Sequence, residues 1–451
     1  MSLRLQCIAL VLHALLVTAG HSANWYVAPE PAGQDEADGS LEKPFATISR
    51  AQEAASPGDT VLVRGGRYTM TDTMITSRKR IFSRVITLDK SGTPGKPITY
   101  RACNDEPPVF DFSQVKPAGQ RVSAFYVSGS WLHLQGIEVV GVQVTLKGHT
   151  QSICVESQGS HNVFEQLKLH DGQAIGIYHV QGSHNLFLNC DAWNNWDYTS
   201  EGGVGGNVDG FGCHPPKGSV GNVFRGCRAW FNSDDGFDCL GAHESVVFEH
   251  CWAAHNGYTS TFKSAGDGNG FKAGGYGAAL PENLPKTIPR HVVRFCLAVG
   301  NKKSGFYANH HPGGGDWINN SAYRNGTNYN MLCRLSDNVT DVDGFGHRLM
   351  NNLGFGSRNE VANMAAARCE LAGNSFSPAL KLNSDDFFSL DINEMFRPRS
   401  AAGELPAMRF MQPALISPLA DAGAETGLPF KGLKPAIGAF EQAAGSPSAS
   451  N

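Results

Sequence analysis

Residues 227–239 read CRAWFNSDDGFDC, and this stretch decides the fold. Its first half follows the pattern C-x-A-x-x-N, which occurs again before and after it. The copies begin at Cys190, Cys227, Cys251, Cys296 and, with Asn in place of Cys, Asn320. Neighbouring copies are 24 residues apart in two cases, and the longer steps of 37 and 45 residues fit the same unit carrying an insertion. A repeat of this length predicts a solenoid.

The repeating unit favours strands over helices. It is short and rich in Gly and Asn, and its apolar residues are mostly Val and Phe. The Cys and the Ala stand two residues apart, as on the inward face of a strand, and both are small enough for the narrow interior of a coil. The Asn tolerates left-handed turn geometry and can hydrogen-bond the copies above and below it. We therefore predict an all-β protein, a parallel β-helix.

A second pattern follows each Asn, in which Phe or Met and then Cys or Ala point inward. The five segments are VDGFGC (208–213), DDGFDC (234–239), GNGFKA (268–273), KSGFYA (303–308) and NYNMLC (328–333). The residue between the two inward ones must then point outward. In four consecutive coils this outward position carries Gly212, Asp238, Lys272 and Tyr307.

Both ends of the solenoid need a cover, because exposed sheet edges aggregate. Near the N-terminus, apolar residues recur at helical spacing: Phe45, Ile48, Ala51 and Ala55. We predict a short capping helix there, followed by a strand over residues 60–63. After about Val342 the repeat fades, and residues 442–451 are typical of a disordered tail.

Composition and charge narrow the class of protein. The 451 residues include 52 Gly and only 17% charged residues, which suits a turn-rich β protein. A net charge of −4 gives no basic excess, so we expect no nucleic-acid partner. We expect one elongated catalytic domain over residues 24–441, and a monomer.

The first residues predict export. Arg4 precedes an apolar run from Cys7 to Val17, which is short for a membrane span and long enough for a signal peptide. We predict a signal peptide over residues 1–23 and export to the cell exterior or the periplasm, with no later membrane segment. An N-terminal membrane anchor is the alternative. Ten cysteines remain without Cys7, and although an exported protein can form disulfides, their ladder positions favour buried free thiols.

Acidic residues gather on one patch of the predicted coils. Asp209 and Asp235 precede Gly-Phe in neighbouring coils, whose strands lie about 4.8 Å apart. In the second of these coils, Asp234 comes directly before Asp235 and Asp238 comes directly after Gly-Phe. Four carboxylates with no basic run beside them indicate a hard cation with oxygen ligands, and Ca²⁺ is the usual one outside cells. A solvated turn and a purely structural calcium are the alternatives.

Lys272 lies one coil beyond Asp238 at the same outward position. A lysine beside a bound dication has its pKa lowered towards the range of a working base. A dication and a base together suit β-elimination from a uronic-acid polymer, so we predict an acidic polysaccharide as the partner. Two other classes stay open: a β-helical glycoside hydrolase with paired Asp residues, and a non-catalytic polysaccharide-binding solenoid.

These residues resemble the pectate lyases of polysaccharide lyase family 9. The similarity covers most of the chain and rests on DGS…KPFATI…PGDTV from residue 38, the GSHN repeats, NVFRGCRAWFNSDDGFD, GNGFK and the closing DAG…GAFE. The resemblance implies a secreted, right-handed parallel β-helix with pectate lyase activity, and it also admits rhamnogalacturonan as substrate. It implies a calcium site at Asp209, Asp234, Asp235 and Asp238, with Lys272 as the catalytic base.

The segment GFYANHHPGGG, residues 305–315, departs from the family pattern. This departure leaves the sugar-binding residues, the polymer and the endo or exo mode open. His310 and His311 lie in this segment, near the predicted groove, and are candidates for contact with sugar. Arg290 and Arg294 are candidates for bidentate binding of a uronate carboxylate.

Overall fold

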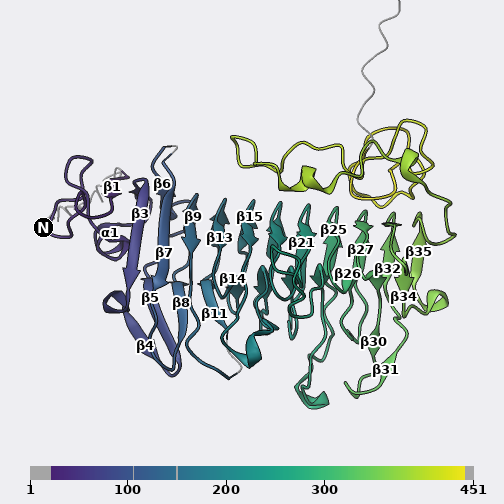
Figure 1. Ribbon diagram of the computed structural model, residues 1–451, viewed down its shortest axis with the longest axis horizontal. Coiled ribbons are helices and arrows are strands. Elements are labelled where there is room, and N and C mark those ends of the chain that lie inside the picture. The colour runs from purple at the N-terminus through teal and green to yellow at the C-terminus, as the bar shows by residue number, and fades with distance from the viewer. Residues whose placement is uncertain (1–21, 105, 149–150, 442–451) are drawn as a thin grey trace, which may run out of the picture.

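The computed structural model describes residues 22–104, 106–148 and 151–441. Within these residues the strands form three long sheets of 12, 10 and 11 strands, and successive coils stack along the long axis of the molecule (Figure 1). One coil contributes one strand to each sheet, and every pairing inside the three sheets is parallel except the pairing of β4 with β5. The predicted parallel β-helix is therefore confirmed.

Each sheet collects every third strand of the coil. The 12-stranded sheet contains β1 (Asn24–Val27), β2 (Thr60–Val63), β6 (Ile98–Ala102), β9 (Leu132–Gln135), β12 (Val163–Glu165), β15 (Leu186–Leu188), β18 (Asn222–Arg225), β21 (Val246–Glu249), β24 (Val292–Arg294), β27 (Asp316–Ile318), β32 (Arg348–Met350) and β35 (Glu370–Ala372). The 10-stranded sheet contains β3 (Gly66–Thr71), β7 (Pro108–Gln114), β10 (Glu138–Val140), β13 (Lys168–His170), β16 (Asp191–Trp193), β19 (Arg228–Trp230), β22 (Trp252–Ala254), β25 (Leu297–Val299), β28 (Ser321–Tyr323) and β33 (Leu353–Phe355). The 11-stranded sheet contains β4 (Ser77–Lys79), β5 (Phe82–Leu88), β8 (Arg121–Val127), β11 (Ser152–Ser157), β14 (Ala174–His179), β17 (Phe211–Cys213), β20 (Phe237–Asp238), β23 (Phe271–Lys272), β26 (Ser304–Tyr307), β29 (Thr327–Asn330) and β34 (Val361–Ala362).

Short helices and one hairpin lie outside the sheets. The helices are α1 (Ile48–Ala54), η1 (Asp72–Met74), η2 (Glu201–Gly203), η3 (Pro281–Asn283), η4 (Ala366–Arg368), η5 (Ser384–Asp386) and η6 (Ile392–Phe396). The hairpin pairs β30 (Cys333–Arg334) with β31 (Asp341–Val342). The predicted capping helix is α1, which begins where the side chain of Thr47 accepts a hydrogen bond from the N–H of Arg50 and buries Ile48 and Ala51.

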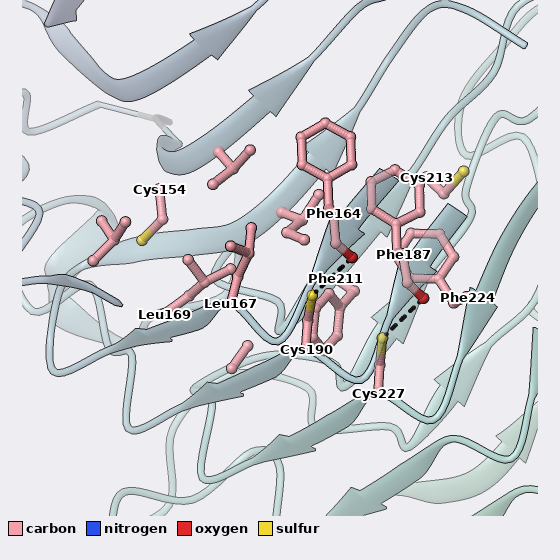
Figure 2. Packing of buried hydrophobic residues seen from close by; sticks show 14 of the residues in the cluster. Cys154, Phe164, Leu167, Leu169, Phe187, Cys190, Phe211, Cys213, Phe224 and Cys227 are labelled. Carbon is pink, nitrogen blue, oxygen red and sulfur yellow. Dashed lines mark hydrogen bonds between the residues drawn. The ribbon is translucent and has the colours of Figure 1, made fainter. Parts of the chain in front are cut away.

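The inward-facing residues form aromatic and thiol stacks along the coil. The ring centroids of Phe187 and Phe224 lie 4.2 Å apart, and those of Phe237 and Phe271 lie 4.7 Å apart. Figure 2 shows Phe187 and Phe224 with the thiols of Cys190 and Cys227 near them, and the Cys190 Sγ donates to the backbone carbonyl oxygen of Phe164. All ten cysteines among the described residues are free, and nine of them are buried, so the prediction of buried free thiols is confirmed.

Asparagine side chains form a ladder at the turn that follows each C-x-A-x-x-N copy. The Asn232 Nδ2 donates to the Asn256 Oδ1 at 3.2 Å, and the Asn256 Nδ2 donates to the Asn301 Oδ1 at 3.0 Å. The predicted bonding between copies is therefore confirmed. Two further ladders were not predicted, and they run through Asn162, Asn185 and Asn222 and through Asn320, Asn352 and Asn374.

Two details of the predicted repeat are wrong. Tyr329, and not Met331, pairs with Phe306, because the fifth copy of the second pattern is shifted by two residues. The coil also continues beyond Val342 through β32, β33, β34 and β35. These last strands lack the Cys and Phe pattern, which is why the sequence did not indicate them.

The chain after β35 covers the outer face of the 10-stranded sheet. Figure 1 shows this segment, residues 373–441, running back along the coil. It buries Phe387, Met395 and Phe410 against side chains of that sheet, including Leu297. Further along the coil, the guanidinium of Arg399 forms an ion pair with Asp191 in β16 at 2.6 Å.

Two predictions fall largely outside the described residues. The structure describes only the last two residues of the predicted signal peptide (1–23) and none of the predicted tail (442–451). In the described part of the chain, every helix is too short or too polar to cross a membrane. Export stays a prediction.

We expect the substitution Asn256→Ala to destabilise the coil. It leaves the N–H and Nδ2 donors of Asn232 without their acceptor in a fully buried position, at a cost of about 3 kcal/mol in unfolding free energy. Guanidinium unfolding measures this change. The control Asn359→Ala alters an exposed asparagine and is expected to change stability by less than about 0.5 kcal/mol. Equal stability of the two variants would contradict a structural role for the ladder.

Candidate active and metal-binding site

The outward positions of the 11-stranded sheet form a row across five coils. The register pairs Tyr178 with Gly212, Gly212 with Asp238, Asp238 with Lys272, and Lys272 with Tyr307. The predicted succession of Gly212, Asp238, Lys272 and Tyr307 is therefore confirmed. Successive members of the row lie about one strand spacing, 4.8 Å, apart along the wall of the coil.

Three aspartates converge just before the strands of this row. Ligand oxygens of Asp209, Asp234 and Asp235 lie within 4.8 Å of one another, and all three side chains are buried. The coils are tied together at this point, because the N–H of Asp235 donates to the Asp209 Oδ1 at 3.1 Å. Asp238 comes three residues after Asp235, on β20, and its side chain is also buried. We call these four aspartates the acidic cluster.

Backbone and amide donors fix the orientation of the carboxylates. The N–H of Asp267 donates to the Asp234 Oδ1 at 2.9 Å, and both the N–H and the Nδ2 of Asn269 donate to the Asp235 Oδ1. The Asp235 Oδ2 is buried, and no described group gives it a hydrogen bond of good geometry. These backbone and amide donors thus hold one oxygen each of Asp234 and Asp235 and leave the other oxygen without a hydrogen bond from them.

Lys272 supplies the positive charge closest to the cluster. Its Nζ lies 3.0 Å from the Asp235 Oδ2 and 3.2 Å from the Asp238 Oδ2, and its side chain is 16% exposed. Burial lowers the pKa of Lys272, but the carboxylates of the acidic cluster together raise that pKa well above its ordinary value. The ammonium form is therefore favoured as long as these carboxylates carry no other cation.

The carboxylates themselves are difficult to ionise together. Burial raises the pKa of Asp209 well above its ordinary range, and repulsion from Asp234, Asp238 and Asp235 raises it further. Burial, followed by repulsion from Asp235, does the same to the pKa of Asp234. A fold that buries several carboxylates at such a cost gains most from a multivalent cation that restores their ionised forms.

The residues fit Ca²⁺. Oxygens that share one Ca²⁺ at 2.3–2.6 Å can lie at most about 5 Å apart, and the oxygens of Asp209, Asp234 and Asp235 satisfy this limit. The donor set consists of carboxylate oxygens without thiol or imidazole, which favours a hard cation over zinc. Asp209, Asp234 and Asp235 are positioned to bind one ion jointly, and Asp238 lies next to them on β20.

The acidic cluster opens into a cavity of about 280 Å³. Its lining includes Lys272 and three residues that the sequence analysis missed: Tyr178, His214 and Leu240. Extending the outward row by one coil would have found Tyr178. No sequence signal marks the other two.

His214 and Asp238 both hydrogen-bond the backbone of Leu240. Its Nδ1 donates to the carbonyl oxygen of Leu240 at 2.7 Å, and the N–H of Leu240 donates to the Asp238 Oδ1 at 2.7 Å. The imidazole lies over Gly212, where a Cβ atom would come within 2.7 Å of the His214 Nε2 and 2.9 Å of the Tyr178 ring. Glycine at this outward position makes room for both rings.

The structure does not bring the two predicted arginines to the acidic cluster. Arg294 lies on β24 in the 12-stranded sheet and pairs with Glu249 at 2.5 Å. Arg290 precedes the same strand and pairs with Asp316 at 2.6 Å. Both charges are already paired within the protein, away from the acidic cluster, and a role as uronate ligands stays a prediction.

The structure places the two predicted histidines in different surroundings. His311 is 1% exposed, and its Nε2 donates to the carbonyl oxygen of Pro289 at 2.7 Å, so it supports a loop and offers nothing to a sugar. His310 remains accessible and forms an ion pair with Asp341 at 2.7 Å, beside a second cavity.

Replacing Asp234 by Asn should separate calcium binding from folding. A carboxyl whose pKa is raised on folding destabilises the folded state at every pH above its unfolded value, so the neutral amide is expected to keep or increase stability at pH 8 without calcium. With calcium, the wild type is expected to gain several degrees in melting temperature, and Asp234→Asn to lose most of that gain.

Thermal unfolding with calcium and with a chelator measures both effects. The control Asp385→Asn changes an exposed carboxylate and should retain the calcium-dependent gain. An unchanged response to calcium in Asp234→Asn would remove this residue from the ion site.

Comparisons with known proteins agree with this geometry. Residues 25–352 match the family model described as "Pel9A-like, right handed beta helix region", which confirms the right-handed coil. Pectate lyase L of Dickeya chrysanthemi is 35% identical over 94% of this chain and 92% of its own length. Among solved structures, a rhamnogalacturonan lyase is 44% identical with a TM-score of 0.83, covering 87% of this chain and 97% of its own. Pectate lyase Pel9A is 32% identical with a TM-score of 0.76, covering 94% of this chain and 97% of its own.

Proposed function

We propose that this protein, a polysaccharide lyase of the Pel9A-like right-handed β-helix family, cleaves a galacturonate-containing polymer by β-elimination. In this proposal the acidic cluster holds Ca²⁺ and Lys272 is the base. The observation that carries the proposal is the distance of 3.0 Å from the Lys272 Nζ to the Asp235 Oδ2 on one outward wall. The glycoside hydrolase and the non-catalytic solenoid lose support, because similar proteins along most of the chain are lyases.

Lys272 accepts the proton from C5 of the uronate, the carbon next to its carboxylate. The electron pair of that C–H bond forms the C4=C5 double bond, and the bond from C4 to the glycosidic oxygen breaks. The leaving oxygen takes a proton from water, and the Lys272 ammonium returns its proton to the hydroxide that remains. The products are a new reducing end and an unsaturated uronate, and no water is added across the bond.

The protein's own residues prepare this step. Ca²⁺, when bound, neutralises the carboxylates that raise the Lys272 pKa and makes the uronate C5 proton more acidic. The burial of Lys272 then favours its neutral amine, which is the form that accepts a proton. The backbone of Leu240, which hydrogen-bonds both the Asp238 carboxylate and the ring of His214, keeps Asp238 beside the amine.

Two polymers are candidate substrates. Polygalacturonate follows from the 35% identity with pectate lyase L over nearly the whole chain. A rhamnogalacturonan backbone, in which galacturonate alternates with rhamnose, follows from the 44% identity with a rhamnogalacturonan lyase. Both polymers present the uronate that β-elimination requires.

Lys272→Ala is expected to lower kcat by about 10³-fold, within the range that general base catalysis contributes. The rise in ultraviolet absorbance from the unsaturated product measures the rate on either polymer. The control Lys168→Ala removes a half-exposed lysine on the 10-stranded sheet and should leave the rate within about twofold of the wild type. A Lys272→Ala variant with wild-type kcat would remove the lysine from the base role.

Chelation of calcium is expected to stop product formation, and added Ca²⁺ to restore it, because the carboxylates then lose and regain their cation. The same ultraviolet assay follows both steps. Added Mg²⁺ serves as the control and should restore little activity, since its shorter, octahedral coordination suits this buried cluster less well. Unaltered activity in the chelator would exclude a calcium-dependent mechanism.

A further inference from the structure

A second cavity of about 360 Å³ adjoins the one at the acidic cluster. Leu240 lines both cavities, so the two are neighbours on the same side of the coil. The second cavity also borders His310, whose ring meets that of Tyr307 edge-on at 5.9 Å, and Tyr307 is the residue next to Lys272 in the outward row. A polysaccharide whose uronate sits at Lys272 can place an adjacent sugar in this second cavity.

The charged groups of the second cavity neutralise each other. The Nε of Arg334 and the Nδ1 of His310 both hydrogen-bond the Oδ1 of Asp341, at 2.8 and 2.7 Å. Burial raises the pKa of Asp341, but these two hydrogen bonds and the charges behind them lower it overall, so its carboxylate stays ionised. The positive charge of the guanidinium is therefore already matched within the protein.

The β30–β31 hairpin fixes this arrangement from one side. The Nη1 of Arg334 donates to the carbonyl oxygen of Gly277 at 3.0 Å. The Nδ2 of Asn338 donates to the carbonyl oxygens of Gly277 and Ala279, and since carbonyls cannot donate, this settles which way the amide points. The Asn338 Oδ1 is then a buried acceptor for which no described group is a donor.

The remaining lining is mostly apolar. Leu240, Ala278, Gly277 and Val339 contribute it. A uronate carboxylate placed here would lose water without meeting an unmatched cation, which is costly. A methyl group would gain from the apolar contact. A sugar hydroxyl brings a donor as well as an acceptor to this lining, whereas a carboxylate brings only acceptors.

We propose that the second cavity binds an uncharged 6-deoxy sugar next to the uronate at the acidic cluster. The substrate is then a backbone in which uronate and neutral deoxy sugar alternate, as galacturonate and rhamnose do in rhamnogalacturonan. This inference rests on the proposed function and selects one of its two polymers.

The wild type is expected to cleave rhamnogalacturonan with a kcat/KM at least about tenfold above that for polygalacturonate, in calcium, by the ultraviolet assay. Asp341→Asn leaves the Arg334 charge unmatched and should move this ratio about tenfold towards polygalacturonate. The matched control is Asp316→Asn, which frees Arg290 of a similar ion pair on the 12-stranded sheet and should leave the ratio unchanged.

A second variant covers the case in which Asp341→Asn disturbs the hairpin. Val339 is 77% exposed at the rim of the second cavity, so Val339→Lys adds a cation without disturbing a core. It should also move the ratio towards polygalacturonate. Ile416→Lys adds the same charge at a residue that is 96% exposed in the C-terminal segment, and it should have no effect on the ratio.

Binding separates this inference from the proposed function. Calorimetry on the Lys272→Ala protein compares rhamnogalacturonan and galacturonate oligosaccharides of equal length without turnover. Tighter binding of the former, weakened by Val339→Lys relative to the latter, supports the neutral subsite even if no polymer is cleaved. A wild type that cleaves or binds the galacturonate series better, or variants that shift no more than their controls, would overturn the inference and leave the lyase proposal standing.

Discussion

The site depends on the register between adjacent parallel strands. In a strand, neighbouring side chains point to opposite faces, so a slip of one residue would send Asp238 and Lys272 into the core and bring Phe237 and Phe271 to the surface. The stacked Phe rings and the Asn ladders oppose such a slip, because both require identical residues to meet coil by coil. The packing of the interior thus determines which charges meet on the outside.

In the acidic cluster, the register brings carboxylates of successive coils close together. Each turn before an 11-stranded-sheet strand exposes backbone N–H groups that hold one carboxylate oxygen, and the next coil repeats the arrangement about 4.8 Å away. Carboxylates are thereby concentrated where burial raises the pKa of Asp209 and of Asp234. The amine of Lys272 shares the same wall, so its charge and those of the Asp235 and Asp238 carboxylates depend on one another.

The sequence predicts most of this region because the information is local and repeated. The alternation within DDGFDC and GNGFKA places Asp238 and Lys272 on the same wall without knowledge of any distant contact. His214 could not be found in this way, since its partner is a carbonyl in the next coil. The Arg334–Asp341 pair depends on a hairpin that leaves the coil and carries no repeat. The ion pairs of Arg290 and Arg294 could not be predicted either, because their partners Asp316 and Glu249 lie in neighbouring coils outside any repeated pattern.

The segment that follows β35 gives the coil a property that stacking alone does not. Each coil touches only its neighbours, so a bare solenoid can fray from its ends in independent steps. Here residues 373–441 bind back across several coils, with Arg399 held by Asp191 about 200 positions earlier in the chain. The Arg399–Asp191 contact can form only after the intervening coils have folded. Once it has formed, the terminal coils unfold together with the middle ones. The segment 373–441 therefore converts a string of small units into one cooperative folding unit.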